Sequence, residues 1–546
     1  MALLNSSSNK TDLFYAVQQS SNESVVSELI AGGADVNRTD NEGKTALFYA
    51  VQQSNNESVV RVLIDAGTDV TITDNEGKTA LFYAVQDNNE RVVRALIEHG
   101  KSLTSPRDIY GRTPLFYAMT KSQSITCYLL EKKVNMRIKD KCGMSFLSFF
   151  VDHCISNSAD SNESCISERI DLIVQKGVKG KTVYVAIMNI IFCKCPLLFH
   201  SGINVPIFIF FLELAKTYST KHERDIDEIL EMVRKTVDDK TQCRTLIPQI
   251  LGLLCKLKFE PNSADTEGNT ALHHAACLPF YGVSKEEVMD LVKKLEKVGI
   301  TVDSKNHQSE TPLLFCLTLH SNDQQLLGES SKLSAIKILV EVCEFLISNG
   351  SSVEETTKKG DSVLHLIVKL LMKILESHGN TSLKDAVQVG IELFKLFSST
   401  SAAKRVINKK DEDLNSPIHL WALLKPPQQC LSDVADGGSV FSDFMKEVLN
   451  KLLECGAQLD ERNKLGQTPL HLCRTWAAVE LLLDFGANPN AVDVSGRSPL
   501  IVAAHNKTHT FFYPDVALDD PKDFWKLTAL EKGLDPWVVD KMEILF

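Results

Sequence analysis

Apolar and polar positions recur at a fixed interval along the N-terminal quarter of the chain. The segment Thr-Asp-Leu-Phe-Tyr-Ala at 11–16 returns as Thr-Ala-Leu-Phe-Tyr-Ala at 45–50 and 79–84, and as Thr-Pro-Leu-Phe-Tyr-Ala at 113–118, each copy 34 residues after the last. A repeat of this length indicates one supersecondary unit per copy, stacked on its neighbours. The 546 residues therefore need not divide into the roughly three or four closed domains that length alone suggests.

Turn and helix signals give each copy a predicted shape. Asp40 and Gly43 suit the first and fourth places of a type I turn, and Thr45 can cap a helix. After a short helix and a polar break, a second helix is expected from about Glu57 and should end at Gly67. Its apolar stripe is Val59, Val60, Val62, Leu63 and Ile64. Each unit is predicted to be turn, helix, break, helix.

These units resemble the ankyrin-repeat family, in which Thr-Pro-Leu-His opens the first helix of a unit of about 33 residues. The matching segments are Thr468-Pro-Leu-His471, Thr270-Ala-Leu-His273, Gly33-Ala-Asp-Val-Asn37 and Gly486-Ala-Asn-Pro-Asn490. The resemblance implies an all-α fold, an ankyrin-repeat solenoid of about eleven or twelve helix-turn-helix units. Later units are expected to be expanded or degenerate.

The family histidine is replaced in the first four copies. Phe14, Phe48, Phe82 and Phe116 stand there, so the polar network that the histidine makes in the family should be missing. Four later copies keep a histidine, which we expect to bond the adjacent turn and to take no part in catalysis. These are His273, His365, His419 and His471.

Beyond residue 150 the helix-opening residues are more widely spaced. Thr270, Thr311, Ser362, Ser416, Thr468 and Ser498 are separated by 41, 51, 54, 52 and 30 positions. The long intervals should hold extra helix, as at Leu366–Leu375, and a loop-like piece at Leu431–Ser442. Second helices are predicted at Glu286–Val298, Leu333–Ile347, Phe444–Leu453 and Val479–Leu483.

Four regions are predicted. Residues 1–143 form four regular repeats, and residues 144–260 form degenerate or eroded helical repeats, with an inserted helical piece as the alternative. Residues 261–513 form expanded repeats. Residues 514–546 should hold a last second helix at Leu527–Glu531 after an insertion, then a C-terminal cap or the start of a further repeat.

Charge and composition exclude some classes of function. Lys plus Arg total 59 against 70 Asp plus Glu, a net charge of −11, which argues against binding DNA, RNA or an anionic membrane through the whole chain. The excess is uneven: residues 1–150 hold 16 basic and 17 acidic residues, whereas residues 411–546 hold 12 and 21. The simpler explanation of this acidic C-terminal part is a solvated surface that aids solubility, and a preference for a basic partner is the alternative.

Cysteine usage and the start of the chain favour the cell interior. Fourteen cysteines are scattered through apolar stretches and no signal peptide precedes them, so we expect a cytoplasmic protein, with the nucleus possible, that is not secreted. The most apolar stretch, Val183–Leu214, is interrupted by Lys194, Pro196 and His200, and no membrane insertion is expected.

No segment supports catalysis, a cofactor or a metal. Gly-Lys-Thr at 43–45, 77–79 and 180–182 lacks the upstream glycine of a phosphate-binding loop. Cys193, Cys195 and His200 lack the second ligand pair typical of a zinc site. An enzyme within residues 144–260 is the weakest alternative that we keep.

The candidate partner-binding residues lie on one face of the N-terminal repeats. On a helix that starts after Thr45, Leu47 and Ala50 define the buried side and Tyr49 lies nearly opposite. Because helices in a stack lie about 8–10 Å apart, a ladder of tyrosines should line the inner, concave side that the resemblance implies. The ladder is Tyr15, Tyr49, Tyr83 and Tyr117, flanked by Gln52 and Gln53 and rimmed by Asn41, Glu42, Lys44, Asn75, Glu76 and Lys78.

We therefore expect a protein-protein interaction scaffold without catalytic activity, since tyrosine is enriched at interfaces. The alternative for the tyrosines is duplication plus packing against the tyrosine and phenylalanine of the next repeat. The alternative for the protein is a recognition arm of a larger multidomain protein or enzyme, of the type that combines tetratricopeptide and ankyrin repeats.

Overall fold

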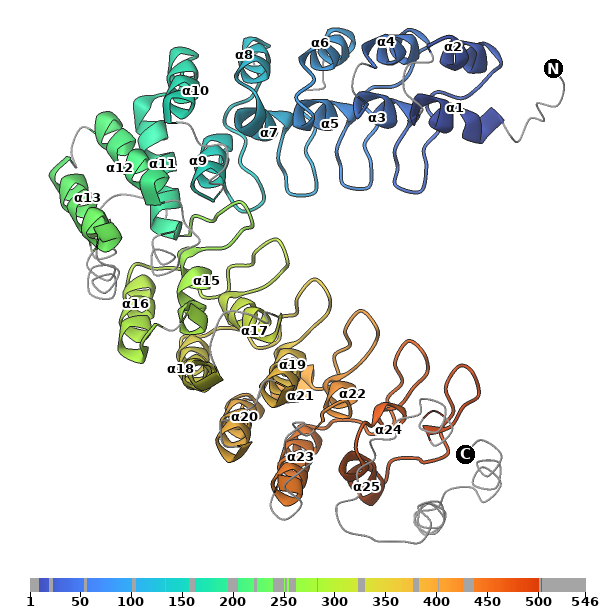
Figure 1. Cartoon of the computed structure of the whole chain (residues 1–546), viewed down its shortest axis with the longest axis vertical. Coiled ribbons are helices and arrows are strands. Elements are labelled where there is room, and N and C mark those ends of the chain that lie inside the picture. Colours follow the sequence, from blue (N-terminus) through green and yellow to red (C-terminus); the bar gives the residue numbers. More distant parts are fainter. Residues whose placement is uncertain are drawn as a thin grey trace. The chain divides into compact units, whose positions relative to one another are not determined.

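The computed structural model describes residues 9–502 except for 19–22, 54–55, 101–104, 133, 157–162, 195–204, 220–222, 239–249, 251–252, 255–261, 282, 323–328, 377–382, 401, 426–436 and 500–501. It divides into two compact units, Met1–Ala271 and Leu272–Phe546. Figure 1 shows the helices of each unit. We describe each unit by itself.

The same five-residue turn opens most of the repeats that the structure describes. In the first described turn the Asp40 amide donates to the Lys44 carbonyl at 2.9 Å and the Gly43 amide to the Asp40 carbonyl at 3.1 Å. The Asp40 carboxylate accepts from the Glu42 and Lys44 amides at 2.8 and 2.9 Å. Gly43 has φ +78°, a conformation that costs glycine little. The turn predicted from Asp40 and Gly43 is confirmed.

Ten turns of this kind occur in the part of the chain that the structure describes. Their first residues are Asp40, Asp74, Asp108, Asp140, Asp265, Asn306, Thr357, Asp411, Asn463 and Asp493. A backbone hydrogen bond can join two neighbouring turns. The second residue of one turn then donates its amide to the carbonyl of the third residue of the preceding turn, as Asn75 does to Glu42 at 2.9 Å. Turn tips thus form rows along the repeats.

Two helices follow each turn of the regular repeats in unit 1. After Thr45 comes α3 (Ala46–Val51), with Leu47 and Phe48 buried, and then α4 (Glu57–Asp65), which ends before Gly67 at φ +87°. The first helices α1, α3, α5 and α7 pack side by side, and α2, α4, α6 and α8 form a second layer (Figure 1). The remaining bounds are α1 (Asn9–Gln18), α2 (Glu23–Ala31), α5 (Ala80–Gln86), α6 (Glu90–His99), α7 (Pro114–Lys121) and α8 (Gln123–Glu131).

The region from residue 144 contains a fifth helix pair and then a change of pattern. α9 (Phe146–Ser156) and α10 (Glu163–Gln175) follow the Asp140 turn. The next helices are α11 (Gly180–Lys194), α12 (Val205–Tyr218) and α13 (Glu223–Asp238), and α11 packs on both α9 and α12. No five-residue turn precedes them among the described residues of 145–264. Erosion of ankyrin pairs stays a prediction, because helix packing carries no record of ancestry.

A buried ionic cluster holds the Asp265 turn to α9 and α11. The Lys194 ammonium lies 3.0 Å from the Asp265 carboxylate and 3.2 Å from Asp152 Oδ1; the second contact is an ion pair without hydrogen-bond geometry. The Thr266 amide donates to Asp152 Oδ2 at 2.8 Å. Burial alone would lower the pKa of Lys194, but the two carboxylates outweigh it and the pKa is raised. A residue at the end of α11 therefore joins segments far apart in the sequence.

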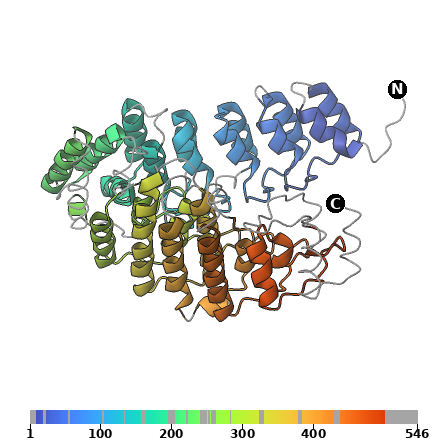
Figure 2. The same ribbon diagram turned by 60° about the horizontal axis from the view of Figure 1, so that its bottom comes forward.

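Unit 2 again pairs helices behind turns (Figure 2). The first helices are α15 (Ala271–Ala276), α17 (Pro312–Asn322), α19 (Val363–Glu376), α22 (Pro417–Trp421) and α24 (Pro469–Leu472). The second helices are α16 (Lys285–Lys297), α18 (Glu329–Ser348), α20 (Leu383–Ser398), α23 (Gly437–Glu454) and α25 (Trp476–Asp484). The short η3 (Leu278–Tyr281) lies between α15 and α16, and the short α21 (Ala403–Val406) lies between α20 and α22. The described residues form an all-α fold without strands.

The predicted second helices of unit 2 are confirmed as α16, α18, α23 and α25. The loop-like interpretation of Leu431–Ser442 is wrong from Gly437 onward, because α23 begins there. Two glycines and a serine open this helix, and burial of Phe441 and Phe444 stabilises it against their weak helix propensity. The helix predicted at Leu527–Glu531, and all of 514–546, lie outside the described residues.

Candidate protein-interaction surface

The replacement of histidine by phenylalanine changes the hydrogen bonding at the helix starts of unit 1. Phe48 and Phe82 are buried, and the buried hydroxyls of Thr45 and Thr79 have no hydrogen-bond partner within the described residues. An unpaired buried hydroxyl costs free energy because its bonds to water are not replaced. The predicted loss of the polar network is confirmed at these two positions.

Unit 2 shows the network intact where histidine is present. The Thr468 amide donates to His471 Nδ1 at 3.1 Å, so the ring proton lies on Nε2, which donates to the Arg497 carbonyl of the next turn at 3.0 Å. His365 and His419 make the equivalent bonds to Asn415 and Gln467 at 2.9 and 3.1 Å. The His273 ring lies 3.1 Å from the Glu310 carbonyl. The predicted bonding of these histidines to the adjacent turn is confirmed.

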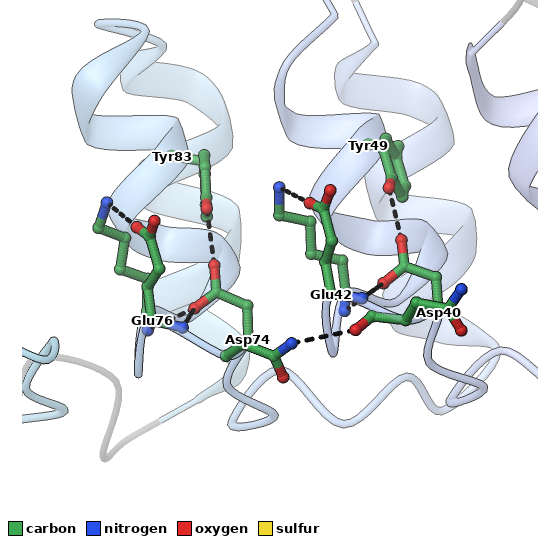
Figure 3. Close-up of polar contacts among 10 residues, drawn as sticks. Asp40, Glu42, Tyr49, Asp74, Glu76 and Tyr83 are labelled. Carbon is green, nitrogen blue, oxygen red and sulfur yellow. Dashed lines mark hydrogen bonds and ion pairs between the residues drawn. The ribbon is translucent and has the colours of Figure 1, made fainter. Parts of the chain in front are cut away.

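Each tyrosine of the regular repeats is tied to the turn of its own repeat. The Tyr49 hydroxyl donates to Asp40 Oδ2 at 2.5 Å (Figure 3). Tyr83 bonds Asp74 and Tyr117 bonds Asp108 in the same way, each at 2.6 Å. The carboxylates are already fixed because their Oδ1 atoms accept two turn amides. These bonds were not predicted from the sequence, although the constant spacing of nine residues between aspartate and tyrosine was a signal.

The tyrosine rings also join neighbouring repeats. Tyr49 packs edge to face on Phe14 of the preceding repeat with ring centres 5.9 Å apart, and Tyr83 packs on Phe48 at 5.7 Å. Tyr117 packs on Phe82 at 5.9 Å. Edge-to-face pairs add stability beyond the area that they bury. Packing between repeats, the predicted alternative to a binding role, therefore occurs. Each of these tyrosines contacts the phenylalanine of the preceding repeat, and Tyr117 also packs on Phe149 of the following repeat with ring centres 5.8 Å apart.

Tyr15 differs from the other three. Its side chain is 65% exposed, whereas Tyr49, Tyr83 and Tyr117 are half-buried. The residue nine positions before Tyr15 is Ser6, which has no carboxylate and lies outside the described residues. The four predicted ladder residues therefore share a helix position but not an environment.

Charged side chains on the turn tips surround Tyr83. Lys44 and Lys78 each pair with the glutamate two residues before, Glu42 and Glu76, at 2.7 Å. Their ammonium groups lie 5.3 and 5.8 Å from the centre of the Tyr83 ring, close enough for attraction to its π-face. The two glutamate side chains remain 67% and 55% exposed. The tips therefore offer carboxylates to solvent while the lysines lie over the aromatic row.

The tyrosine hydroxyls are held protonated. The bond to Asp40, with burial, raises the pKa of Tyr49 to about 12. Burial and the bond to Asp74 raise the pKa of Tyr83 further. For Asp40, burial favours a higher pKa, but the bond from Tyr49 and the turn amides outweigh it, so the pKa is lowered. At neutral pH the Tyr49–Asp40 pair is therefore a neutral phenol bound to a carboxylate, and the bond positions the two side chains.

The remaining candidate residues complete the surface. Asn41 is exposed, and the Asn75 side chain donates to the Asn41 carbonyl at 3.0 Å. Gln52 is exposed and Gln53 half-buried, both next to α3. We call Tyr49, Tyr83, Tyr117 and the tip residues Asn41, Glu42, Lys44, Asn75, Glu76 and Lys78 the tyrosine face. This face combines aromatic area with charged side chains.

The motifs that resemble a phosphate-binding loop and a metal site have structural positions in the repeats. Gly43-Lys44-Thr45 lies in a turn and at a helix start. The buried Cys193 thiol donates to the Asn269 carbonyl at 3.1 Å, and burial raises its pKa, while Cys195 and His200 lie outside the described residues. Among the residues with described positions no group of His, Cys, Asp or Glu is arranged to hold a metal ion, and no helix is long and apolar enough to span a membrane.

Comparison with known proteins agrees with this geometry. A family model for ankyrin repeats matches residues 2–74, 53–140 and 440–513. Rabankyrin-5 of Mus musculus is 49% identical over 51 residues, 9% of this chain and 4% of its own length, and Rabankyrin-5 of Homo sapiens is 40% identical over 68 residues, 11% of this chain and 6% of its own. Intracellular phospholipase A2 of Caenorhabditis elegans is 26% identical over 164 residues, 30% of this chain and 12% of its own length.

A stack of helix pairs behind five-residue turns, clamped by Thr-x-x-His bonds in unit 2, defines a helical repeat protein whose surfaces serve interaction. The chain contains ankyrin repeats, which the family model matches within residues 2–140 and 440–513. It matches only a small part of the length of the relatives named above. Ankyrin repeats are protein-interaction modules, and the repeats of this chain are modules of that general class.

Proposed function

We propose that this protein is a scaffold without catalytic activity and that the tyrosine face binds a partner protein. The observation that carries the proposal is the row of exposed tips, Glu42 and Glu76 among them, beside half-buried tyrosines. Tyrosine and exposed carboxylates together provide area and orientation, as interfaces require. The family resemblance puts this face on the inner side of the stack, and we include Tyr15, Gln52 and Gln53 in the proposed surface.

The contacts of the tyrosines decide which variants test this proposal. Replacing Tyr49 or Tyr83 by serine removes a hydrogen bond and a ring contact between repeats, so lost binding could reflect lost structure. The side chains of Asn41, Glu42 and Glu76 are exposed, and the two glutamates pair with lysines of their own tips. Their combined replacement by alanine should leave the fold intact.

The experiment is affinity capture from cell lysate with the full chain, the triple alanine variant and a matched control. Glu90→Ala is the control, because Glu90 also pairs with a basic residue, Arg94 at 2.6 Å, on a second helix away from the tips. We expect at least one captured protein to be lost with the triple variant and kept with the control, at equal thermal midpoints. Full recovery with the triple variant would exclude the tyrosine face as the binding surface.

A second candidate is that the chain is the recognition arm of a larger protein. The match to a protein named intracellular phospholipase A2, which covers 12% of that protein's length, favours this candidate over an isolated scaffold. An antibody against the four N-terminal repeats should then detect an endogenous protein well above 60.7 kDa. A single species at that mass would count against the arm.

We also propose that the protein resides in the cytoplasm, with the nucleus possible. None of the ten cysteines in the described ranges forms a disulfide, as expected in a reducing compartment. Cell fractionation with the same antibody is the test, and recovery of the protein only from culture medium or sealed vesicles would contradict the proposal.

A further inference from the structure

One turn tip of unit 2 carries an apolar residue in an unfavourable backbone conformation. Leu414 occupies the fourth place of the Asp411 turn, which is glycine in eight of the ten described turns. Its φ is +59° and its side chain is 45% exposed. A branched residue in the left-handed region is strained because its Cβ crowds the backbone. Glycine would make the same turn without strain, so the fold gains little from Leu414.

The next two tips add further exposed aliphatic side chains. Leu465, in the third place of the Asn463 turn, is 55% exposed, and Val494, in the second place of the Asp493 turn, is 72% exposed. Val492, beside the last turn, is 45% exposed. We call Leu414, Leu465, Val492 and Val494 the apolar tips.

Backbone bonds hold the apolar tips together. The Lys464 amide donates to the Asp413 carbonyl at 2.9 Å, and the Val494 amide donates to the Leu465 carbonyl at 3.0 Å. A Cβ added to Gly466 would lie 3.1 Å from Val494 Cγ1, so the last two tips touch. Arg462 donates to the carbonyls of Gly466 and Val492. The four side chains therefore belong to one row of three consecutive turns.

The corresponding tips of unit 1 show that the fold does not require apolar residues there. Asn41 and Glu42 occupy the second and third places of the Asp40 turn, and Asn75 and Glu76 those of the Asp74 turn. These turns have the same backbone hydrogen bonds. Consecutive exposed aliphatic tips are thus a property of unit 2, and exposed apolar clusters mark interaction sites.

The charges beside the apolar tips indicate the sign of the charge that a partner of this surface carries. Glu412 and Asp413 are exposed on the same tip as Leu414 and form no ion pair with other described residues. Nearby cations are engaged: Lys410 pairs with Glu461 at 2.8 Å, and Arg497 with Asp493 at 2.9 Å. Residues 411–502 contain 13 Asp plus Glu and 7 Lys plus Arg. The Glu412 and Asp413 carboxylates are therefore available to pair with cations of a partner.

We propose that the apolar tips dock a segment of a partner protein in which apolar side chains adjoin lysine or arginine. The apolar side chains cover Leu414, Leu465 and Val494, and the cations meet Glu412 and Asp413. This surface shares no residue with the tyrosine face, and a binding role accounts for the presence of a strained leucine at a place where eight of the ten described turns have glycine.

The test is selection of a random dodecapeptide library on the immobilised full chain, followed by affinity measurement of the enriched peptides. We expect peptides that combine apolar residues with an excess of Lys and Arg. Leu414→Gly, and Leu465→Ser combined with Val494→Ser, should each weaken binding about ten-fold or more. The matched control is Val25→Ser in α2, also an exposed valine at 39%, which should leave binding unchanged.

The Leu414→Gly variant separates binding from folding, because it relieves strain and should not lower stability. Glu412→Gln combined with Asp413→Asn should weaken binding and reduce its dependence on salt. Tyr49→Phe should leave these peptides bound, so failure of the tyrosine face does not affect this test. The proposal fails if enriched peptides are acidic, or if they bind the apolar-tip variants as well as the unaltered chain.

Two other results would also overturn the proposal that the apolar tips dock a partner protein. Self-association of the full chain that disappears with Leu465→Ser and Val494→Ser would make the tips an interface between copies. A large fall in the thermal midpoint of the same variant would mean that the tips pack on another part of their own chain.

Discussion

Tyr49 donates its hydroxyl proton to Asp40 across 2.5 Å, and the same residue pair, nine positions apart, recurs in the next two repeats. The bond ties the first helix of a repeat to its own turn, while the Tyr49 ring packs on Phe14 of the repeat before. One side chain therefore links a turn, a helix and a neighbouring repeat. This linkage is present where the family histidine is replaced.

Removing the hydroxyl alone should cost a moderate amount of stability. Tyr49→Phe keeps the ring contact and loses one half-buried bond to a carboxylate, so we expect a loss of about 1 kcal/mol. Tyr49→Ser also loses the edge-to-face contact and should cost about 1–2 kcal/mol more. Urea unfolding of unit 1, followed by hydrogen exchange, measures both. Equal losses for the two variants would show that the ring contact contributes nothing.

Stability should also fall at high pH through the same pair. The pKa of Tyr49 is raised from its usual value near 10 to about 12 in the folded protein. The unfolded chain therefore releases the proton first, so the stabilisation is full below pH 10 and is lost as pH rises toward 12. Urea midpoints at pH 9 and 11 should differ less in Tyr49→Phe than in the unaltered chain.

A matched pair of threonines tests the missing histidine network. The buried Thr45 hydroxyl has no partner among described residues, whereas the Thr468 hydroxyl lies 2.9 Å from His471 Nδ1. Thr45→Val should be neutral or stabilise by up to about 1 kcal/mol, and Thr468→Val should cost about 1–2 kcal/mol. Chemical denaturation of the two variants is the measurement. A clear loss with Thr45→Val would show that the hydroxyl is satisfied, for example by water.

The ionic cluster at the end of α11 should be sensitive to loss of its cation. Lys194→Met leaves the buried Asp152 and Asp265 side chains without compensation, and breaking such a pair costs about 3–5 kcal/mol. Lys216→Met is the control, because Lys216 pairs with Asp227 at 2.6 Å in exposed positions and should cost less than about 1 kcal/mol. Thermal unfolding monitored by circular dichroism compares them, and equal effects would contradict a role for burial.

Mild acid should weaken unit 2 through its histidines. Burial lowers the pKa of His365, His419 and His471, and for each the backbone bond to the next turn opposes this only in part. Because the unfolded chain binds the proton more readily, stability is full above pH 6.5 and declines as pH falls toward the folded pKa. Hydrogen exchange at pH 7.5 and 5.5, corrected for intrinsic rates, should show weaker protection in α19, α22 and α24. His419→Gln should reduce the change.

Most of the fold could be predicted because its signals are short in range. The Asp40 turn, the start of α4 at Glu57 and its end before Gly67 follow from residues within a few positions of one another. The start of α23 could not be predicted in this way. Gly437 and Gly438 disfavour a helix locally, and burial of Phe441 and Phe444 outweighs that preference.

The candidate surface was only partly accessible to sequence reasoning. Helical periodicity placed Tyr49 away from Leu47, and the structure leaves Tyr49 half-buried with Leu47 in the core. Helical periodicity tells on which side of its own helix a side chain lies. It carries no information on which residues of a neighbouring repeat lie on that side. The predicted packing on the following repeat occurs from Tyr117 to Phe149, whereas the contact of Tyr49 with Phe14 of the preceding repeat was not predicted.

The sequence by itself determined the repeat, its turns and the family, because turn chemistry and helical periodicity act over a few residues and recur. Only the tertiary structure decided that Lys194 meets Asp265, 71 positions away, and that Leu414, Leu465 and Val494 stand exposed on one row of tips. Such contacts depend on how repeats stack, and stacking brings together residues whose separation in the sequence varies with every expanded repeat.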